Sequence, residues 1–136
     1  MLENREEALR KIAVGDIFHA EGSTGSSRTC VAVQVRDTTI LARDVSIQAI
    51  YEFNRRTGVA VRYFGSTPYD YIIDSVALLP DDIRDIILEI DQKNREGEYR
   101  RAEDPNWERS PADAALTESE IRAYLFCANF YRTNPL

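Results

Sequence analysis

The feature that most constrains the fold is the close spacing of alternating apolar stretches between residues 14 and 79. Segments such as "RTCVAVQV" and "VAVRYF" are separated by only a few polar or glycine residues. Alternation with a period of two is typical of strands with one buried face. Parallel strands need crossover connections of a dozen or more residues, and residues 15–64 leave no room for them. The pattern therefore predicts five or six antiparallel strands.

The alternation also assigns faces and turns within this region. We expect Thr29, Val31, Val33 and Val35 on one side of a strand, and Val45, Ile47, Ala49, Tyr51 and Phe53 on one side of another. Gly58 follows the polar run "NRRT", where a turn with a positive φ is expected. The stretch "EGSTGSSRT" is expected to be the bend between two strands.

Helices are predicted on both sides of the strands. Residues 1–12 form a short helix with acidic residues early and basic residues late. Pro80 begins a helix over 80–97, which buries a stripe made of Ile83, Ile86, Ile87 and Ile90, and Gly97 is expected to end it. Residues 98–116 contain Pro105 and Pro111 and predict an irregular connection that Trp107 pins to the body. "TESE" at 117–120 is a capping box for a last helix over 117–132.

Together these elements predict one α+β domain over residues 1–136. Its strands, 14–79, form a small antiparallel β-barrel, similar to SH3-like barrels, or a strongly bent sheet. A short N-terminal helix precedes them and two C-terminal helices follow. The chain has 136 residues, which suffices for one hydrophobic core.

Composition excludes several classes of function. The formal net charge is −6, and a general polyanion-binding surface requires the opposite sign. Cys30 and Cys127 lie among apolar neighbours, so we expect buried thiols and no zinc site. Neither a signal peptide nor a membrane span is present, and cytoplasmic residence is expected.

No catalytic motif accompanies the candidate chemical groups. The loop Gly22–Ser27 lacks the lysine and the following helix of a phosphate-binding loop. His19, the one histidine, lies on a strand without a nearby nucleophile motif. Asp70 and Asp74 are roughly 13 Å apart if extended, and Asp81, Asp82 and Asp85 suit a helix start. We expect no cofactor, no metal site and no enzymatic activity; a small-molecule enzyme using His19 and a nearby Asp would need a pocket that joins them.

The last helix is the most informative surface. Ile121, Tyr124, Leu125 and Ala128 form one apolar stripe, and a second contains Ala123, Phe126, Cys127 and Phe130. Either the helix lies in a groove of its own domain, or one stripe faces another chain. We interpret the protein as a protein-interaction module that self-associates or docks a partner through this helix. The expected contact residues are Ala123, Phe126, Phe130 and Tyr131.

The alternative function is binding of single-stranded nucleic acid. Small barrels bind single strands by combining cations with stacking aromatic rings. The residues that would serve are Arg55, Arg56, Arg62, Tyr63 and Tyr69. The acidic balance of the chain favours a solvated hairpin tip instead.

Four blocks, "GDIFHA", "TTILARDVSIQ", "EFNRRTG" and "IDSVALLPDDI", resemble those shared by a group of small uncharacterised proteobacterial proteins. The resemblance covers about residues 14–96 and leaves out the last helix. It implies a bacterial cytosolic protein and assigns no catalytic or binding residue.

Overall fold

The structure of the protein, a computed structural model, describes residues 4–23, 25–63 and 71–136. Six strands lie within these residues: β1 Ile17–Gly22, β2 Ser27–Val35, β3 Thr39–Asp44, β4 Ile50–Asn54, β5 Ala60–Tyr63 and β6 Tyr71–Ser75. The helices are α1 Arg5–Arg10, α2 Asp81–Glu103, α3 Pro111–Ala114 and α4 Glu118–Thr133.

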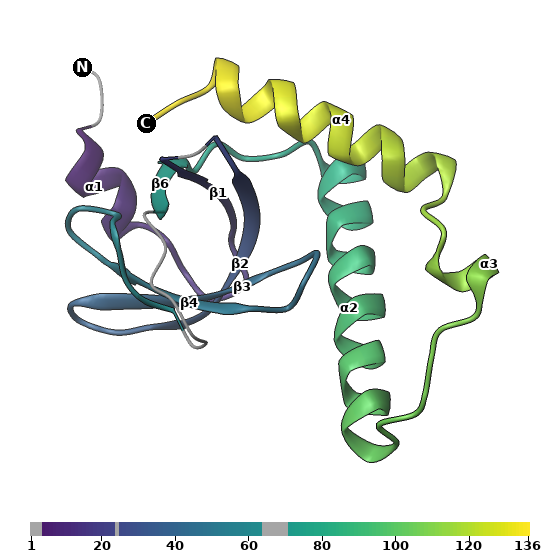
Figure 1. Cartoon of the computed structure of the whole chain (residues 1–136). Coiled ribbons are helices and arrows are strands. Elements are labelled where there is room, and N and C mark those ends of the chain that lie inside the picture. The colour runs from purple at the N-terminus through teal and green to yellow at the C-terminus, as the bar shows by residue number, and fades with distance from the viewer. Residues whose placement is uncertain (1–3, 24, 64–70) are drawn as a thin grey trace.

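All six strands belong to one antiparallel sheet in the order β5-β4-β3-β2-β1-β6. The sheet curls on itself, so that Val59, just before β5, forms a bridge with Ile72 on β6 at the opposite edge (Figure 1). Short turns connect the first five strands, as the sequence spacing predicts. This confirms the α+β class: the small antiparallel sheet is strongly bent and forms a half-barrel, with a short helix before it and helices after it.

The inner face of the sheet encloses one hydrophobic core. Leu9 on α1 and Ile12 just after it are buried in this core. The strands contribute Phe18, Ala20, Cys30, Ala32, Ile40, Ala42, Tyr51, Phe53, Tyr71 and Ile73. Arg5 fixes α1 to the strands by donating to the carbonyl oxygens of Thr57 and Ile73. Gly58 has φ +78°, as expected, and a side chain there would strike the Arg5 guanidinium.

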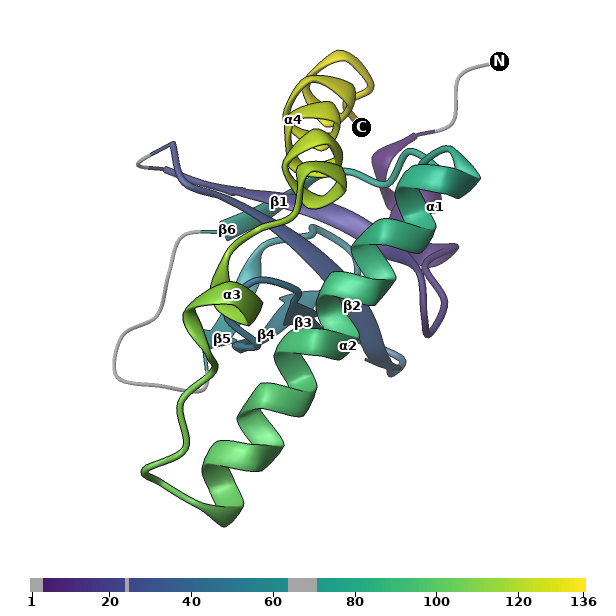
Figure 2. The ribbon, with the colours of Figure 1, turned by 90° about the vertical axis from the view of Figure 1, so that its right-hand side faces the viewer.

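Helix α2 runs along the outer face of the sheet, and α4 lies across the start of α2 and beside β6 (Figure 1 and Figure 2). Val31 from β2 and Val45 from the turn after β3 meet Leu79, just before α2, and the helix residues Ile83, Ile87, Ile90, Ala123, Cys127 and Tyr131. The end of α4 is tied to the edge strand, because Leu136 N–H donates to Asp74 C=O at 2.8 Å and Ser75 Oγ donates to Asn134 C=O at 2.6 Å. The helical layer is therefore anchored at both the sheet and the chain end.

The prediction that Val31 and Val35 lie on the same face of β2 is wrong, because β2 contains a β-bulge. Ala32 pairs with Ala42, and Gln34 pairs with Leu41, so Val33 is an extra residue with no partner across the strand. An extra residue reverses the alternation beyond it. Val31 consequently lies in the outer core and Val35 packs against the inner one, whereas simple alternation placed both on the same side.

The prediction of one strand face from Val45 to Phe53 is also wrong, because a tight turn separates β3 from β4. Asp44 ends β3, and its Oδ1 accepts hydrogen bonds from the amides of Ser46 and Ile47 at 2.7 and 3.3 Å. Such side-chain bonding forms a tight turn in place of a continuing strand. Gln48 adopts a positive φ of 61° in this turn. Val45 is buried against the helices and Ile47 is exposed, so the two do not share a buried face with Tyr51 and Phe53.

Helix α2 is longer than predicted, because Gly97 lies inside it and does not end it. The Arg109 side chain lies over this glycine, donating to Lys93 C=O at 2.9 Å and to Asn94 Oδ1 at 3.1 Å. A Cβ at position 97 would collide with the Arg109 guanidinium. Gly97 is thus a packing residue, and the helix runs on to Glu103.

The expected irregular connection is correspondingly shorter and contains the four-residue helix α3. Trp107 pins it as predicted, since the guanidinium groups of Arg100 and Arg101 lie 5.7 and 5.8 Å from its ring centroid. The predicted capping box is also confirmed. Thr117 Oγ1 accepts from Glu120 N–H at 3.1 Å, and Glu120 Oε1 accepts from Thr117 N–H at 3.2 Å.

Candidate functional site

The inward line of α4 is buried in the protein's own outer core, against α2 and the sheet. Ala123, Cys127 and Tyr131 are buried in the outer core, and Tyr131 stacks on the His19 ring at a centroid distance of 5.1 Å. This corrects the expectation for Ala123 and Tyr131, which were grouped with the residues that contact a partner. Sequence patterning could not separate them, because the whole helix is rich in apolar residues.

Two apolar edges flank this buried line. Phe126, 36% exposed, and the half-buried Phe130 form one edge, with stacked rings 5.3 Å apart. Ile121 and Leu125 form the other edge and are 46% and 68% exposed. At 3.6 residues per turn, the two edges lie on opposite sides of a polar back made of Arg122 and Asn129. The helix therefore has two separate exposed apolar edges, not one continuous apolar surface.

The edge with Ile121 and Leu125 has regularly spaced exposed residues. The exposed residues at alternating three- and four-residue steps are Glu118, Ile121, Leu125, Ala128 and Arg132, which we call the α4 stripe. This spacing keeps side chains on one side of a helix and is the one that coiled coils use. An acidic residue begins the α4 stripe, a basic residue ends it, and Leu125 is its midpoint.

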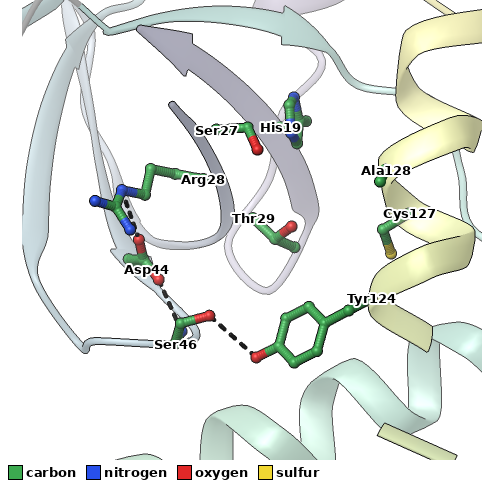
Figure 3. A pocket seen from close by; sticks show the side chains of 9 residues that line it. All are labelled: His19, Ser27, Arg28, Thr29, Asp44, Ser46, Tyr124, Cys127 and Ala128. Carbon is green, nitrogen blue, oxygen red and sulfur yellow. Dashed lines mark hydrogen bonds and ion pairs between the residues drawn. The ribbon is translucent and has the colours of Figure 1, made fainter. Parts of the chain in front are cut away.

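A polar pocket of about 140 Å³ lies between the sheet and α4 (Figure 3). Strands β1 and β2 contribute His19, Ser27, Arg28 and Thr29; Asp44 and Ser46 come from the end of β3 and its turn; α4 contributes Tyr124, Cys127 and Ala128. Tyr124 Oη and Ser46 Oγ are hydrogen-bonded at 3.0 Å and join the two walls. Antiparallel pairing of His19 with Thr29 explains why these two side chains face the same space.

His19 and Asp74 form a tight pair beside this pocket. His19 Nδ1 lies 2.6 Å from Asp74 Oδ1, and β6 supplies the aspartate because it is the neighbour of β1. The carboxylate fixes the ring nitrogen that carries hydrogen as Nδ1. The geometric condition for acid–base use of His19, a nearby aspartate beside a pocket, is therefore met. Asp70 lies outside the described residues.

Arg28 and Asp44 occupy the far side of the pocket. The Arg28 Nε and Asp44 Oδ2 atoms are 3.3 Å apart, and Asp44 is 1% exposed. Arg28 Nε also donates to Tyr71 Oη at 3.1 Å. Burial raises the pKa of the Asp44 carboxyl, although the amides of Ser46 and Ile47 and the charge of Arg28 oppose the rise. Sequence analysis missed both residues; the signal for Asp44 is an aspartate two residues before a serine at a strand end.

The thiols in and near the pocket are unreactive in character. Cys30 and Cys127 are free and buried, as expected from their apolar neighbours. Burial raises the pKa of the Cys127 thiol to about 11 and that of Cys30 well above its ordinary value. The thiolate, which is the nucleophilic form, is therefore scarce at neutral pH.

Of the residues expected to contact nucleic acid, Arg55 and Arg56 are described with their side chains. Arg55 donates to the carbonyl oxygens of Arg36 and Arg10 at 3.1 and 2.9 Å, so it braces α1 against the β2–β3 turn. Arg56 is exposed beside it. The side chains of Arg62 and Tyr63, and all of Tyr69, lie outside what the structure describes. Arg55 thus stabilises the packing of α1 beside the β2–β3 turn.

A groove of about 560 Å³ lies between α1, β1 and the start of α2. Its base is apolar and its rim carries Lys11 and Arg84 together with Asp16 and Asp81. The cations and carboxylates balance, so the groove does not select a ligand by the sign of its charge. The expected bend at Gly22–Ser27 is confirmed as the connection of the antiparallel β1–β2 hairpin, of which residue 24 is not described.

Within the described ranges, no group of three or more His, Cys, Asp or Glu side chains is arranged to hold a metal ion. The helices in these ranges are also too short or too polar to cross a membrane. No family model matches the chain, and neither a curated protein nor a solved structure matches it. The interpretation of these surfaces therefore depends on their own geometry.

Proposed function

We propose that the protein is a protein-interaction module that pairs with a second copy of itself through the α4 stripe. The observation that carries the proposal is Leu125, an aliphatic side chain that is 68% exposed at the centre of a regular helical edge. Exposed apolar side chains that are grouped at helical spacing are typical of helix–helix contacts. Helix α2 and the sheet already cover the opposite line of the same helix, so α4 is held in place for such a contact.

Charge supports a second copy in antiparallel orientation. Glu118 and Arg132 each lie seven residues from Leu125, since 125 − 118 and 132 − 125 are both 7. A two-fold axis at Leu125 brings Glu118 of each copy beside Arg132 of the other. A parallel pair would instead place like charges together, which costs free energy. Antiparallel pairing also places the small Ala128 opposite Ile121, so the helices can approach closely.

The contact is small, which sets the expected affinity. Stable specific complexes bury about 1,200–2,000 Å² in total, and a single pair of helix edges buries less. We therefore expect weak, reversible pairing, with a dissociation constant on the order of 10⁻⁴ M. The second apolar edge, Phe126 and Phe130, lies across the polar back of α4 and outside this contact.

Sedimentation velocity from 10 μM to 2 mM tests the proposal. We expect the sedimentation coefficient to rise with concentration for the natural protein and to stay monomeric for Leu125→Ser. Leu78→Ser is the matched control, because Leu78 is 89% exposed and lines the groove between α1, β1 and the start of α2 rather than the α4 stripe. A natural protein that stays monomeric at 2 mM would refute the proposal. So would a Leu125→Ser variant that associates as strongly as the Leu78→Ser variant.

A further inference from the structure

We infer that a cleft beside α1 is a binding site for a small phosphorylated polyol, a molecule with one phosphate group and several hydroxyl groups. The cleft has a volume of about 310 Å³ and lies where α1, the β2–β3 turn and the turn after β4 meet. Arg10 lines it from α1, Asp37 and Thr38 from the β2–β3 turn, and Arg55 and Arg56 from the turn after β4. Helix α4 does not border the cleft, so binding there does not depend on the proposed pairing.

Cations outnumber carboxylates in this cleft, although the whole chain carries a net charge of −6. Three guanidinium groups line it, together with two carboxylates. One of these carboxylates, Glu6, pairs with Arg10 at 3.1 Å and offsets its charge. Arg55 and Arg56 then face the single carboxylate of Asp37, which leaves an excess positive charge for an anionic ligand.

Arg55 contributes a charge that the described residues do not neutralise. Its guanidinium is half-buried and donates to the carbonyl oxygens of Arg36 and Arg10 at 3.1 and 2.9 Å. Carbonyl oxygens carry only partial charges, and no carboxylate of the described residues forms an ion pair with this guanidinium. Each terminal nitrogen carries two hydrogens, so each keeps one hydrogen for another acceptor. Charges that are taken out of water are normally paired, and an anion in the cleft would pair this one.

Arg56 and Asn54 add donors at the same turn. The Arg56 guanidinium is exposed and forms neither a hydrogen bond nor an ion pair within the described ranges. Asn54 Oδ1 accepts from the amides of Arg56 and Thr57 at 2.9 and 3.0 Å, and the Nδ2 group of Asn54 remains available as a donor. Guanidinium groups match the oxygen atoms of a phosphate group in charge and in geometry. We therefore assign the phosphate to the wall formed by Arg55 and Arg56.

The remaining wall suits hydroxyl groups. All seven residues that line the cleft are polar or charged, so an apolar ligand would leave their hydrogen bonds unmade. The Asp37 carboxylate can accept hydrogen bonds from hydroxyl groups, and Thr38 Oγ1 can donate or accept. The same carboxylate repels a second anionic group. One phosphate next to several hydroxyl groups therefore fits the cleft better than a diphosphate or a hydrocarbon.

The volume limits the size of the molecule. A dry protein cavity of about 150 Å³ holds benzene, which has six heavy atoms. The cleft, at about 310 Å³, is about twice as large and admits roughly twelve heavy atoms. A phosphate ester of a short polyol, such as glycerol, has this size. A nucleic-acid strand requires a basic groove that follows many phosphates, which a cleft of this size does not provide.

Glycerol 3-phosphate tests the inference by ¹H–¹⁵N NMR titration of the full chain at 50 μM and constant ionic strength. Inorganic phosphate lacks the hydroxyl-bearing chain, and glycerol lacks the phosphate. We expect glycerol 3-phosphate to shift the backbone amide signals of Thr38, Arg55 and Arg56 with a dissociation constant on the order of 10⁻³ M. Inorganic phosphate should bind at least three-fold more weakly, and glycerol should give no saturable shift. No saturation by glycerol 3-phosphate at 50 mM, or equal affinity for inorganic phosphate, would overturn the inference.

Arg56→Gln removes the exposed guanidinium without disturbing a contact of the described residues. We expect glycerol 3-phosphate to bind at least ten-fold more weakly, as measured from the signals of Thr38 and Arg55. Arg84→Gln is the matched control, because Arg84 is also exposed but lines the groove between α1, β1 and the start of α2. Unchanged binding in Arg56→Gln, or an equal loss in Arg84→Gln, would overturn the inference.

Asp37→Asn tests the hydroxyl contact separately. Loss of the carboxylate reduces repulsion for both anionic probes, but only glycerol 3-phosphate also loses a strong acceptor for its hydroxyl groups. We therefore expect the ratio of the two affinities, glycerol 3-phosphate over inorganic phosphate, to fall at least two-fold. An unchanged or larger ratio would refute the assignment of hydroxyl groups to this wall.

Discussion

Arg43 on β3 and Asp91 on α2 are joined by two parallel hydrogen bonds, from Nε to Oδ1 at 2.9 Å and from a terminal guanidinium nitrogen to Oδ2 at 2.7 Å. Gln48, in the turn after β3, adds a third donor to Asp91 Oδ1 at 3.0 Å. Both charged side chains are largely buried between the sheet and the helix. This carboxylate therefore ties α2 to the half-barrel by three hydrogen bonds.

Arg43→Ala should strongly destabilise the protein. Removing one partner of a buried ion pair leaves the other charge uncompensated, which typically costs about 3–5 kcal/mol. Urea unfolding followed by circular dichroism measures the loss. The double variant Arg43→Met/Asp91→Leu is the control, because it removes both charges and should recover most of the stability. A cost below about 1 kcal/mol for Arg43→Ala would mean that the pair is not buried in solution.

The same pair predicts a loss of stability in acid. Burial alone would raise the pKa of the Asp91 carboxyl, but the hydrogen bonds from Arg43 and Gln48 outweigh it and lower the pKa below its ordinary value. A carboxyl whose folded-state pKa is lowered stabilises the fold above the unfolded-state pKa of about 4, and this contribution fades as the pH falls through the folded-state value.

The measurement is the difference in unfolding free energy between the natural protein and Asp91→Asn, from pH 6 to pH 2.5. We expect this difference to shrink as the pH falls. The opposite shift of the Asp44 pKa is present in both proteins, so it cancels in the difference. A difference that is constant over this range would contradict the lowered pKa of Asp91.

Helix starts could be predicted from the sequence because their signals are local. Thr117 and Glu120 satisfy each other's amides within one turn, and Pro80 directly precedes α2. The end of α2 could not be predicted, because Gly97 lies inside the helix and gives room to the side chain of Arg109, which contacts the helix from a later segment. A glycine has the same sequence signal whether it ends a helix or lets a side chain approach it.

The candidate site shows the same division. The exposed spacing of Ile121 and Leu125 is a helical pattern that the sequence displays, whereas the burial of Tyr131 depends on His19, which lies more than a hundred residues away in the chain. The pair of Arg28 with Asp44 also depends on how far β2 extends past the end of β3. Strand register and β-bulges decide which side chains come into contact, and the alternation of apolar and polar residues does not specify either of the two.

Gly97→Ala should reveal the contact of Arg109 with α2. Alanine favours a helix interior over glycine by about 1 kcal/mol. In an Arg109→Ala background, we expect the substitution to stabilise the protein by about that amount. In the natural background the gain should be smaller or reversed, because the new methyl group displaces the Arg109 guanidinium from Lys93 and Asn94. Equal effects in the two backgrounds would disprove the contact; urea unfolding of the four proteins gives the coupling.

The two thiols should react only when the protein unfolds. Cys127 has a pKa of about 11, so roughly one thiol in 10⁴ is ionised at pH 7, and Cys30 is fully buried. We expect an aromatic disulfide reagent to modify neither thiol within minutes in buffer and both in 8 M urea. Cys127→Ser and Cys30→Ala identify which thiol reacts first. Rapid labelling of Cys127 in buffer would show that α4 leaves the sheet.

Reversing charges at the ends of the α4 stripe tests the antiparallel pairing directly. Glu118→Arg alone and Arg132→Glu alone each place two like-charge contacts in a symmetric pair. Exposed ion pairs contribute about 0.2–1 kcal/mol each, so we expect pairing to weaken roughly 2- to 30-fold for either variant. Both variants also oppose the helix dipole, and unfolding at 5 μM measures that separate effect.

Combining the variants separates charge pairing from a general loss of helix stability. An equimolar mixture of the two single variants restores both opposite-charge contacts across an antiparallel two-fold axis, as does the double variant with itself. Sedimentation of the mixture should therefore show stronger association than either variant alone, and added salt should reduce this gain. A parallel pair would place Glu118 beside its own counterpart, and the mixture and the double variant would then respond differently. Recovery in the mixture without recovery in the double variant would thus exclude the antiparallel arrangement while leaving association through Leu125 in place.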